Sequence, residues 1–295
     1  MAMHGKAQSA MEYLMTYGWA ILIIAVVLAV LFEIGVFNGS AFAPKAPPGS
    51  CSVYRPEGPG TTFDINLGGV CNGELPQYVA GFNQFLSSYI STGTSPYLSN
   101  TAFTFVAWSN LYIPLSACPS SSMAIIDGGV LHNTELGYGR SGCSHIDFST
   151  ANTADVVIDT FDVVPRPYYT WGQYAGVYNG VTITLYVDGY PVNSVNSVQG
   201  DVPITGISIG GISGFPAFTL NGLISNVQIY NTSLSSNQIT ALYDEGIGGA
   251  PINLQHLVAW YPLNGNANDS SGNGNNGVPS NVMWDSNWET GYTAP

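Results

Sequence analysis

The chain has 295 residues, of which 45% are hydrophobic and only 8% are charged, so it is long enough for one large domain or two ordinary ones. Its 18 Asp and Glu against 5 Lys and Arg give a formal net charge of −13, which repels phosphate backbones and excludes nucleic acids as partners. With 35 Gly and 18 Tyr, the surface depends on hydroxyl and amide groups for solubility, a profile typical of proteins outside cells.

The first predicted element is an uncharged apolar run from Tyr13 to Phe32. At about 1.5 Å per residue, a helix of this length covers roughly 30 Å, which is the hydrocarbon thickness of a bilayer. Its apolar residues lie all round the helix, so a soluble core would need neighbours on every side of it. We therefore predict a transmembrane helix.

The residues before this run differ from an ordinary secretory signal, because Lys6 is the only basic residue among them apart from His4 and Glu12 is acidic. The string KAQSAMEYL over 6–14 resembles the class III signal of archaeal type IV pilin-like proteins. The resemblance implies that a prepilin peptidase cleaves between Ala7 and Gln8 and leaves the apolar helix on the mature chain. The leader is then residues 1–7, and residues 8–37 form a transmembrane or filament-core helix.

Glu12 is expected to act in assembly. A carboxylate at the edge of a hydrocarbon helix costs free energy unless it is paired. Cleavage before Gln8 creates an α-amino group that is mostly cationic at neutral pH, and this amine can pair with Glu12 of a neighbouring subunit in a filament. The alternative is that Glu12 reaches the lipid headgroups.

A Pro-, Gly- and Ser-rich linker is predicted over residues 38–50, followed by an exported domain over 51–295. Pilin-like subunits usually continue the helix into the headgroup, so the early break favours a simple surface anchor as the alternative to a filament subunit.

Four cysteines, Cys51, Cys71, Cys118 and Cys143, follow the apolar run. An even number on the oxidising side of a membrane indicates disulfides. Four cysteines allow three pairings, of which the sequence-local one joins Cys51 to Cys71 and Cys118 to Cys143. The spacing of Cys and His residues does not match a metal site.

The domain alternates short β-branched or aromatic runs with Gly, Asn, Pro and Ser, which predicts an all-β sandwich. In the run 181–187, Val181, Ile183, Leu185 and Val187 share one apolar face, and Thr182, Thr184 and Tyr186 share a wettable face. The dipeptide Asp188-Gly189 that follows predicts a tight turn.

One helical segment is predicted in the domain. It opens at Ser235, buries Ile239, Leu242 and Tyr243, and ends at Gly246.

Residues 82–108, 181–189 and 221–243 resemble the early strands, a strand with a Tyr-Val-Asp-Gly turn, and the closing strand and short helix of the concanavalin-A-like, laminin-G-like lectin family. The resemblance implies a jelly-roll sandwich. This chain has Ser225-Asn226 where the family usually has an Asp-Glu pair, so a role carried by those acids is in doubt.

The segment 256–277 resembles the opening strand and Asn/Gly loop of that family, although it follows the closing strand. Residues 256–295 are too few for a second sandwich, which needs about 100 residues. Three accounts remain open. The segment folds back beside residues 223–230 in a circular permutation, it completes a neighbouring subunit by strand donation, or it is the loose remainder of a truncated module.

Asp155, Asp159 and Asp162 are the nearest group to a catalytic carboxylate set. We expect Asp155 and Asp159 to share a face and Asp162 to point the other way. The chain lacks the Glu-x-Asp-x-Glu pattern of sandwich glycosidases, so no enzyme is predicted.

Three further kinds of candidate site remain. Asp269, in an Asn- and Gly-rich loop, is a candidate calcium ligand, against the alternative that the loop only makes turns. Asn38, Asn231 and Asn268 stand in sequons and are candidate glycosylation sites. Five aromatic residues are candidates for stacking on sugar rings, although core or rim packing is the favoured expectation; they are Tyr168, Tyr169, Trp171, Trp284 and Trp288.

Together these features predict a cell-surface structural and adhesive protein: a pilin-like subunit that displays a lectin-like domain to glycans or surface-layer proteins and self-assembles into filaments. The alternatives are a monomeric, membrane-anchored surface lectin and a secreted carbohydrate-active enzyme. Calcium is the only cofactor that the sequence suggests.

Overall fold

The computed structural model describes residues 17, 19–28, 75–92, 98, 102–112, 122–128, 134–139, 143–151, 156–196, 204 and 206–295. Several predicted features lie outside these residues: the cleavage site at Ala7 and Gln8, Glu12, the linker over 38–50, Asn38, Asp155, and the cysteines Cys51, Cys71 and Cys118.

The chain divides into two compact units. The first contains a helix over residues 19–28 whose described side chains are all exposed, from Trp19 to Leu28. Among the described residues, no helix has the length and apolar character that a membrane crossing requires. The predicted apolar run, 13–32, also includes residues that the structure does not describe.

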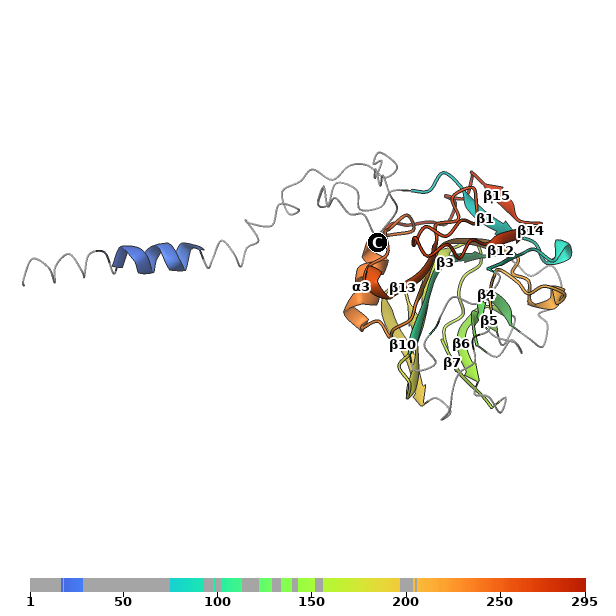
Figure 1. Cartoon of the computed structure of the whole chain (residues 1–295), viewed down its shortest axis with the longest axis horizontal. Helices are drawn as coiled ribbons and strands as arrows, with labels where there is room; N and C mark the ends of the chain where they lie inside the picture. The colour runs from blue at the N-terminus through green and yellow to red at the C-terminus, as the bar shows by residue number, and fades with distance from the viewer. Residues whose placement is uncertain are drawn as a thin grey trace, which may run out of the picture. The chain divides into compact units, whose positions relative to one another are not determined.

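The second unit is a sandwich of two antiparallel sheets (Figure 1). The larger sheet contains β1 (Val79–Phe82), β3 (Phe103–Leu111), β8 (Trp171–Tyr178), β9 (Thr182–Val187), β10 (Tyr190–Asn196), β12 (Gly222–Tyr230), β13 (Leu257–Tyr261) and β15 (Met283–Asp285). Its order in space is β10-β9-β8-β3-β12-β1-β15, with β13 also paired to β12.

The smaller sheet contains β2 (Tyr89–Ser91), β4 (Met123–Gly128), β5 (Glu135–Gly139), β6 (His145–Ala151), β7 (Val157–Phe161), β11 (Ile207–Ile209) and β14 (Val278–Ser280). Its order is β14-β2-β11-β4-β5-β6-β7. The prediction of an all-β sandwich is confirmed.

The main core lies between the two sheets. Strand alternation sends every second side chain inward, so Phe103 and Phe105 of β3 meet Phe148 of β6, with ring centroids 6.2 and 6.4 Å apart. Gly176 of β8 lies against the same ring, and a Cβ there would lie too close to Phe148. The interior is therefore packed closely enough that one added methyl group would displace a ring.

A second apolar layer covers the outer face of the larger sheet. The helix α3 (Ser236–Asp244) begins with a capping box, in which the Ser235 hydroxyl accepts from the Gln238 N–H and the Gln238 side chain accepts from the Ser235 N–H. Its residues Ile239 and Leu242 are buried against β3, β8 and β12. The predicted helix at this position is confirmed, although Tyr243, which was expected to be buried, is only half-buried. Figure 1 shows the helix on the outer side of the sandwich.

The strand predicted over 181–187 has the expected core face, but the prediction was wrong for two of its residues. Ile183, Leu185 and Val187 are buried in the core, but Val181 precedes β9 and is exposed. Tyr186, expected on a wettable face, is buried beneath α3, where its hydroxyl lies 3.0 Å from the Ser236 Oγ. The helix covers this face, which local alternation does not reveal.

The turn after β9 has the backbone that its sequence predicts. Asp188 and Gly189 have φ values of +50° and +80°, the left-handed conformation that a two-residue hairpin between twisted strands needs. The turn joins β9 to β10 and packs against α3, because the Thr240 hydroxyl donates to the Gly189 carbonyl at 2.8 Å.

The segment that resembles the family's opening strand lies within its own sandwich. β13 pairs with β12 of the same chain, with Val227 opposite Tyr261 and Tyr230 opposite Leu257. This is the place that the circular-permutation account expected. Further along, β14 pairs with β2 and β15 pairs with β1, so the C-terminal segment contributes strands to both sheets.

A backbone bulge in β12 makes room for this arrangement. Asn226 has a φ of +49° and interrupts the pairing of β12 with β3. Before the bulge β12 pairs with β1, and after it with β13. One strand thereby serves two partners along the same side.

Candidate functional site

The outer face of the smaller sheet carries a continuous row of mostly polar residues. The strand registers place residues of all seven strands opposite one another; in spatial order they are Val278, Ser91, Ser208, Asp127, Glu135, Ser149 and Asp159. In β2, β11, β4, β5, β6 and β7, residues adjacent to this row belong to the core or pack against it. The sequence therefore builds one oxygen-rich face on this sheet.

Exposure varies along this row. Asp127 and Glu135 are buried, whereas Asp147, Ser149 and Asp159 on β6 and β7 are half-buried. The face is therefore accessible at both ends: on its β6–β7 side, where the acids lie, and at its β14–β2–β11 end, where Ser91 and Ser208 are half-buried and Val278 is exposed.

Asp127 of β4 and Glu135 of β5 are direct partners across the two strands. Burial raises the pKa of Asp127 to about 7. Burial, and then the charge of Asp127, raise the pKa of Glu135 to about 8, while a hydrogen bond from Ser122 acts in the opposite direction. The pair therefore holds protons near neutral pH that ordinary carboxyl groups have released.

Two glycines leave space on the same face. A Cβ on Gly139 would lie 2.9 Å from Asp147 Oδ2, and a Cβ on Gly137 would be too close to Glu135 Oε1 and the Met123 carbonyl. Any other residue at these positions would have to displace the carboxylates. Gly137 and Gly139 therefore leave room for the side chains of Glu135 and Asp147.

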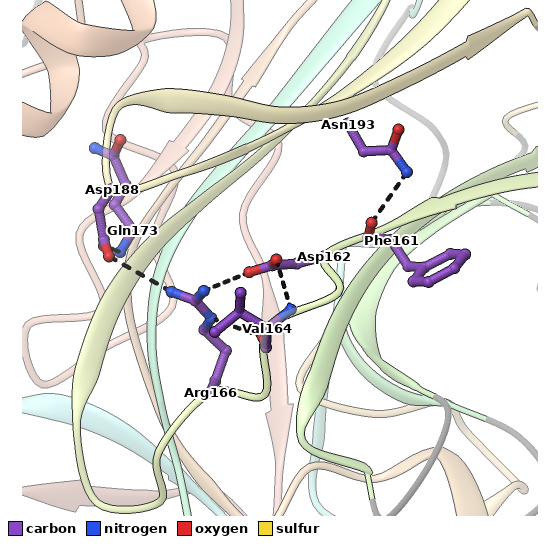
Figure 2. A network of polar contacts seen from close by, with 7 residues as sticks. All are labelled: Phe161, Asp162, Val164, Arg166, Gln173, Asp188 and Asn193. Atoms are coloured by element: carbon purple, nitrogen blue, oxygen red, sulfur yellow. Dashed lines mark hydrogen bonds and ion pairs between the residues drawn. The ribbon is translucent and has the colours of Figure 1, made fainter.

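An ionic network lies where β7 leads into β8 (Figure 2). Arg166 forms an ion pair with buried Asp162 and lies 3.9 Å from the Asp188 carboxylate. Asp188 also accepts from the Gln173 N–H at 2.9 Å. Burial raises the pKa of Asp188, and the hydrogen bond from Gln173 and the charge of Arg166 oppose the rise.

Figure 2 also shows Asn193 of β10 donating to the Phe161 carbonyl of β7 at 3.1 Å. With the ionic network, this contact joins an edge of the larger sheet to an edge of the smaller one. The two interactions therefore hold the two sheets together at this side of the sandwich.

The predicted carboxylate group does not assemble in the described residues. Asp159 belongs to the outer polar row, whereas Asp162 is buried and bound to Arg166. Asp155 lies outside the described residues. The expected opposite direction of Asp162 is therefore correct.

The Asp269 carboxylate organises its own loop. Its Oδ1 accepts from the N–H groups of Trp260 and Ser271 at 3.0 and 2.8 Å, and its Oδ2 accepts from Asn275 N–H at 2.9 Å. These bonds match the alternative in which the loop makes turns. In the part of the chain that the structure describes, no three acidic, His or Cys side chains gather as a metal site, and calcium binding at Asp269 stays a prediction.

The remaining predicted sites have different surroundings. Asn268 is exposed, whereas the Asn231 side chain lies 3.1 Å from His256 Nδ1 and is half-buried.

Cys143 is buried and disulfide-bonded. The other three cysteines lie outside the described residues, so the pairing stays open.

The predicted aromatic residues are mainly packing residues, as favoured from the sequence. Trp171 and Trp288 are buried, their rings meet edge to face at 5.7 Å, and Trp171 Nε1 donates to the Trp288 carbonyl. Tyr168 and Trp284 pack against the main core. Tyr169 is half-exposed, with its ring 5.1 Å from that of Tyr112.

Sequence reasoning missed the outer acids Asp127, Glu135 and Asp147. A signal was present in the run HIDFST over 145–150, where polar and apolar residues alternate. The proximity of Asp127 to Glu135 had no such signal, because it depends on the register between two strands.

Two antiparallel sheets, a covering helix and a polar outer face define a lectin-like β-sandwich. The chain belongs to the concanavalin A-like lectin/glucanases superfamily, whose sequence profile matches residues 84–240, more than half of the chain. No curated protein sequence matches it.

Solved structures share the fold. A proposed carbohydrate-binding protein from Bacteroides ovatus ATCC 8483 has a TM-score of 0.53 and 17% identity, and the match covers 71% of this chain and 60% of that protein. The heptameric SAP-like pentraxin of Limulus polyphemus has a TM-score of 0.51 and 13% identity, covering 71% of this chain and 96% of the pentraxin. This chain thus spans less than two thirds of the Bacteroides protein's length.

Proposed function

We propose that the sandwich binds carbohydrate on the β6–β7 side of its outer polar face. The observation that carries this proposal is a half-buried group of three residues: Ser149 and Asp159, which are opposite each other, and Asp147, two residues before Ser149 in β6. Their oxygens can form hydrogen bonds with the hydroxyl groups of a sugar. The description of the Bacteroides neighbour as carbohydrate binding is consistent with it.

Glycan-array screening of the full chain in detergent, followed by titration calorimetry with the best ligand, tests this proposal. We expect the pair Asp147→Ala and Asp159→Ala to weaken binding at least tenfold, because two acceptors are lost. Ser194→Ala, on exposed β10 of the other sheet, is the matched control and keeps wild-type affinity. Absence of any glycan ligand, or equal affinity of all variants, would contradict the proposal.

We further propose that the chain is displayed at the cell surface as a pilin-like subunit. The supporting features are the class III-like signal around Gln8, Glu12 and the apolar run over 13–32, together with the exposed apolar side chains of the helix over 19–28. Glycans or surface-layer proteins would then be the ligands of the displayed domain. A monomeric surface lectin is the alternative.

Mass spectrometry and electron microscopy separate these possibilities. A mature chain that begins at Gln8, and sheared filaments that Glu12→Gln abolishes without loss of membrane insertion, are the expected results. A mature chain that begins near residue 38 would refute the display proposal and leave the carbohydrate site unaffected.

A further inference from the structure

Four neighbouring strands of the smaller sheet each place one acidic residue on its outer face. The strand register brings Asp127 of β4 opposite Glu135 of β5. Glu135 lies opposite Ser149 of β6, which in turn lies opposite Asp159 of β7. Asp147 lies two residues before Ser149 and therefore on the same face of β6. We call Asp127, Glu135, Asp147 and Asp159 the acid row.

Positive charge does not balance the acid row within the part of the chain that the structure describes. Arg166 is the only Lys or Arg among the described residues, and Asp162 and Asp188 bind it in the network of Figure 2. On the face itself, His145 of β6 is the only described residue that can become a cation. With a net charge of −13 on the whole chain, the face has a negative potential that repels anions.

One buried oxygen of the acid row lacks a hydrogen-bond donor. Glu135 is 4% exposed, and its Oε1 has no hydrogen-bond partner among the described residues. This oxygen lies over Gly137, 2.5 Å from the place that a Cβ would take. Gly137 is the cross-strand partner of Asp147, so the oxygen lies beside the proposed carbohydrate site. An acceptor that is buried without a donor costs free energy, and a ligand that brings O–H groups supplies the donor.

Carboxylates select the chemistry of a ligand in two ways. An ionised carboxylate only accepts hydrogen bonds, so a group that binds it must donate. Sugar hydroxyl groups donate, whereas ionised carboxylate and sulfate substituents of a glycan do not, and like charge repels them. Burial raises the pKa of Asp127 to about 7, and burial with the charge of Asp127 raises the pKa of Glu135 to about 8. The row therefore gains negative charge as the pH rises to 8.

We propose that the carbohydrate site takes neutral glycans and that the acid row excludes glycans with carboxylate or sulfate groups. This inference rests on the proposed carbohydrate site and names the class of its ligand. Because salt screens the repulsion between exposed charges, the exclusion weakens as the ionic strength rises.

Matched pairs of saccharides test the proposal. Three pairs each contain an oligomer of mannuronic, galacturonic or glucuronic acid and its carboxyl-reduced form, which carries CH₂OH in place of COO⁻. The fourth pair is dextran and dextran sulfate. Titration calorimetry of the full chain in a neutral detergent at pH 8 measures both members. At low salt we expect the neutral member of a pair to bind at least tenfold more tightly than the anionic one. At about 0.5 M NaCl this ratio should fall at least threefold.

Two double variants show whether the acid row causes the preference. The variant with Asp147→Asn and Asp159→Asn should lower the ratio at low salt at least threefold, because two charges of the row are lost while side chains of the same shape remain. The matched control, Asp244→Asn with Glu289→Gln, also removes two charges. Its two residues are exposed in α3 and in the C-terminal segment, outside the acid row, so it keeps the wild-type ratio.

The outcomes separate this inference from the carbohydrate site itself. Equal or tighter binding of the anionic members would overturn the inference and leave the carbohydrate site standing. So would a preference for neutral members that neither salt nor the Asn variant changes, since the preference would then be steric. If no member of any pair binds, the carbohydrate site is refuted and the inference falls with it.

Discussion

Asp127 and Glu135 show what burial does to the pKa of a carboxyl group. The pKa values of about 7 and about 8 lie above the ordinary value near 4 that the unfolded chain has. Between a pH of about 4 and a pH of about 8, the folded state therefore binds more protons than the unfolded state. The free energy of unfolding therefore falls as pH rises from about 4 to about 8, by about 1.4 kcal/mol per pH unit for each extra proton.

Replacing both acids by their amides removes this pH dependence. We expect Asp127→Asn with Glu135→Gln to flatten the decline in stability between pH 5 and pH 8 and to make the chain more stable than wild type at pH 8. Urea denaturation at a series of pH values measures this. Asp244→Asn, at an exposed position of α3, is the control. Parallel curves for wild type and double variant would refute the expectation.

The bulge in β12 depends on one side chain. Asn226 Nδ2 donates to the Gly249 carbonyl at 2.9 Å, and its Oδ1 accepts from Gln228 Nε2 and Trp260 Nε1 at 3.1 and 2.8 Å. Asn also adopts a positive φ more readily than most residues. The residue thereby joins β12, β13 and the segment after α3.

Asn226→Ala should cost roughly 2–4 kcal/mol of stability, because it leaves several buried polar partners unsatisfied. Chemical denaturation measures the loss. Asn268→Ala, at an exposed position of the Asn/Gly loop, serves as the control and should cost less than about 0.5 kcal/mol. A loss at Asn226 no larger than that of the control would mean that the bulge does not need this side chain.

Elements with local signals were predictable from the sequence. Ser235 and Gln238 predicted the start of α3, and Asp188-Gly189 predicted the hairpin between β9 and β10, because capping and turn chemistry act within a few residues. Tyr186 was misplaced, since a distant helix covers it. The Asp127–Glu135 pair and the Asn226 bulge depend on strand register and were not predictable.

At the scale of the whole molecule, the C-terminal segment is part of both sheets. β13 pairs with the second half of β12, β14 pairs with β2, and β15 pairs with β1. Removing residues 254–295 would leave these strands without partners and would uncover Tyr230, which is fully buried and lies opposite Leu257. The segment is therefore integral to the fold.

We expect a chain that ends at Asn253 to lose cooperative unfolding and protection from proteolysis. Addition of a separate 254–295 peptide should restore both, because the pairing surface of β12 would again be satisfied. Thermal circular dichroism and limited trypsin or chymotrypsin digestion provide the measurements. A truncated chain that unfolds like the wild type would show that the segment is dispensable.

The C-terminal strands contact residues that are made much earlier in synthesis, as in the hydrogen bond from the Ser88 hydroxyl to the Asn281 carbonyl, 193 residues away. Residues 257–285 leave the ribosome after every strand that they pair with, and contacts of such long range form slowly. If the chain is exported as proposed, the domain cannot close on the inner side of the membrane while its last strands are still being made. An incompletely folded chain can pass through a translocation channel. Because the last strands complete the domain, the polypeptide stays unfolded enough to be translocated until it has crossed the membrane.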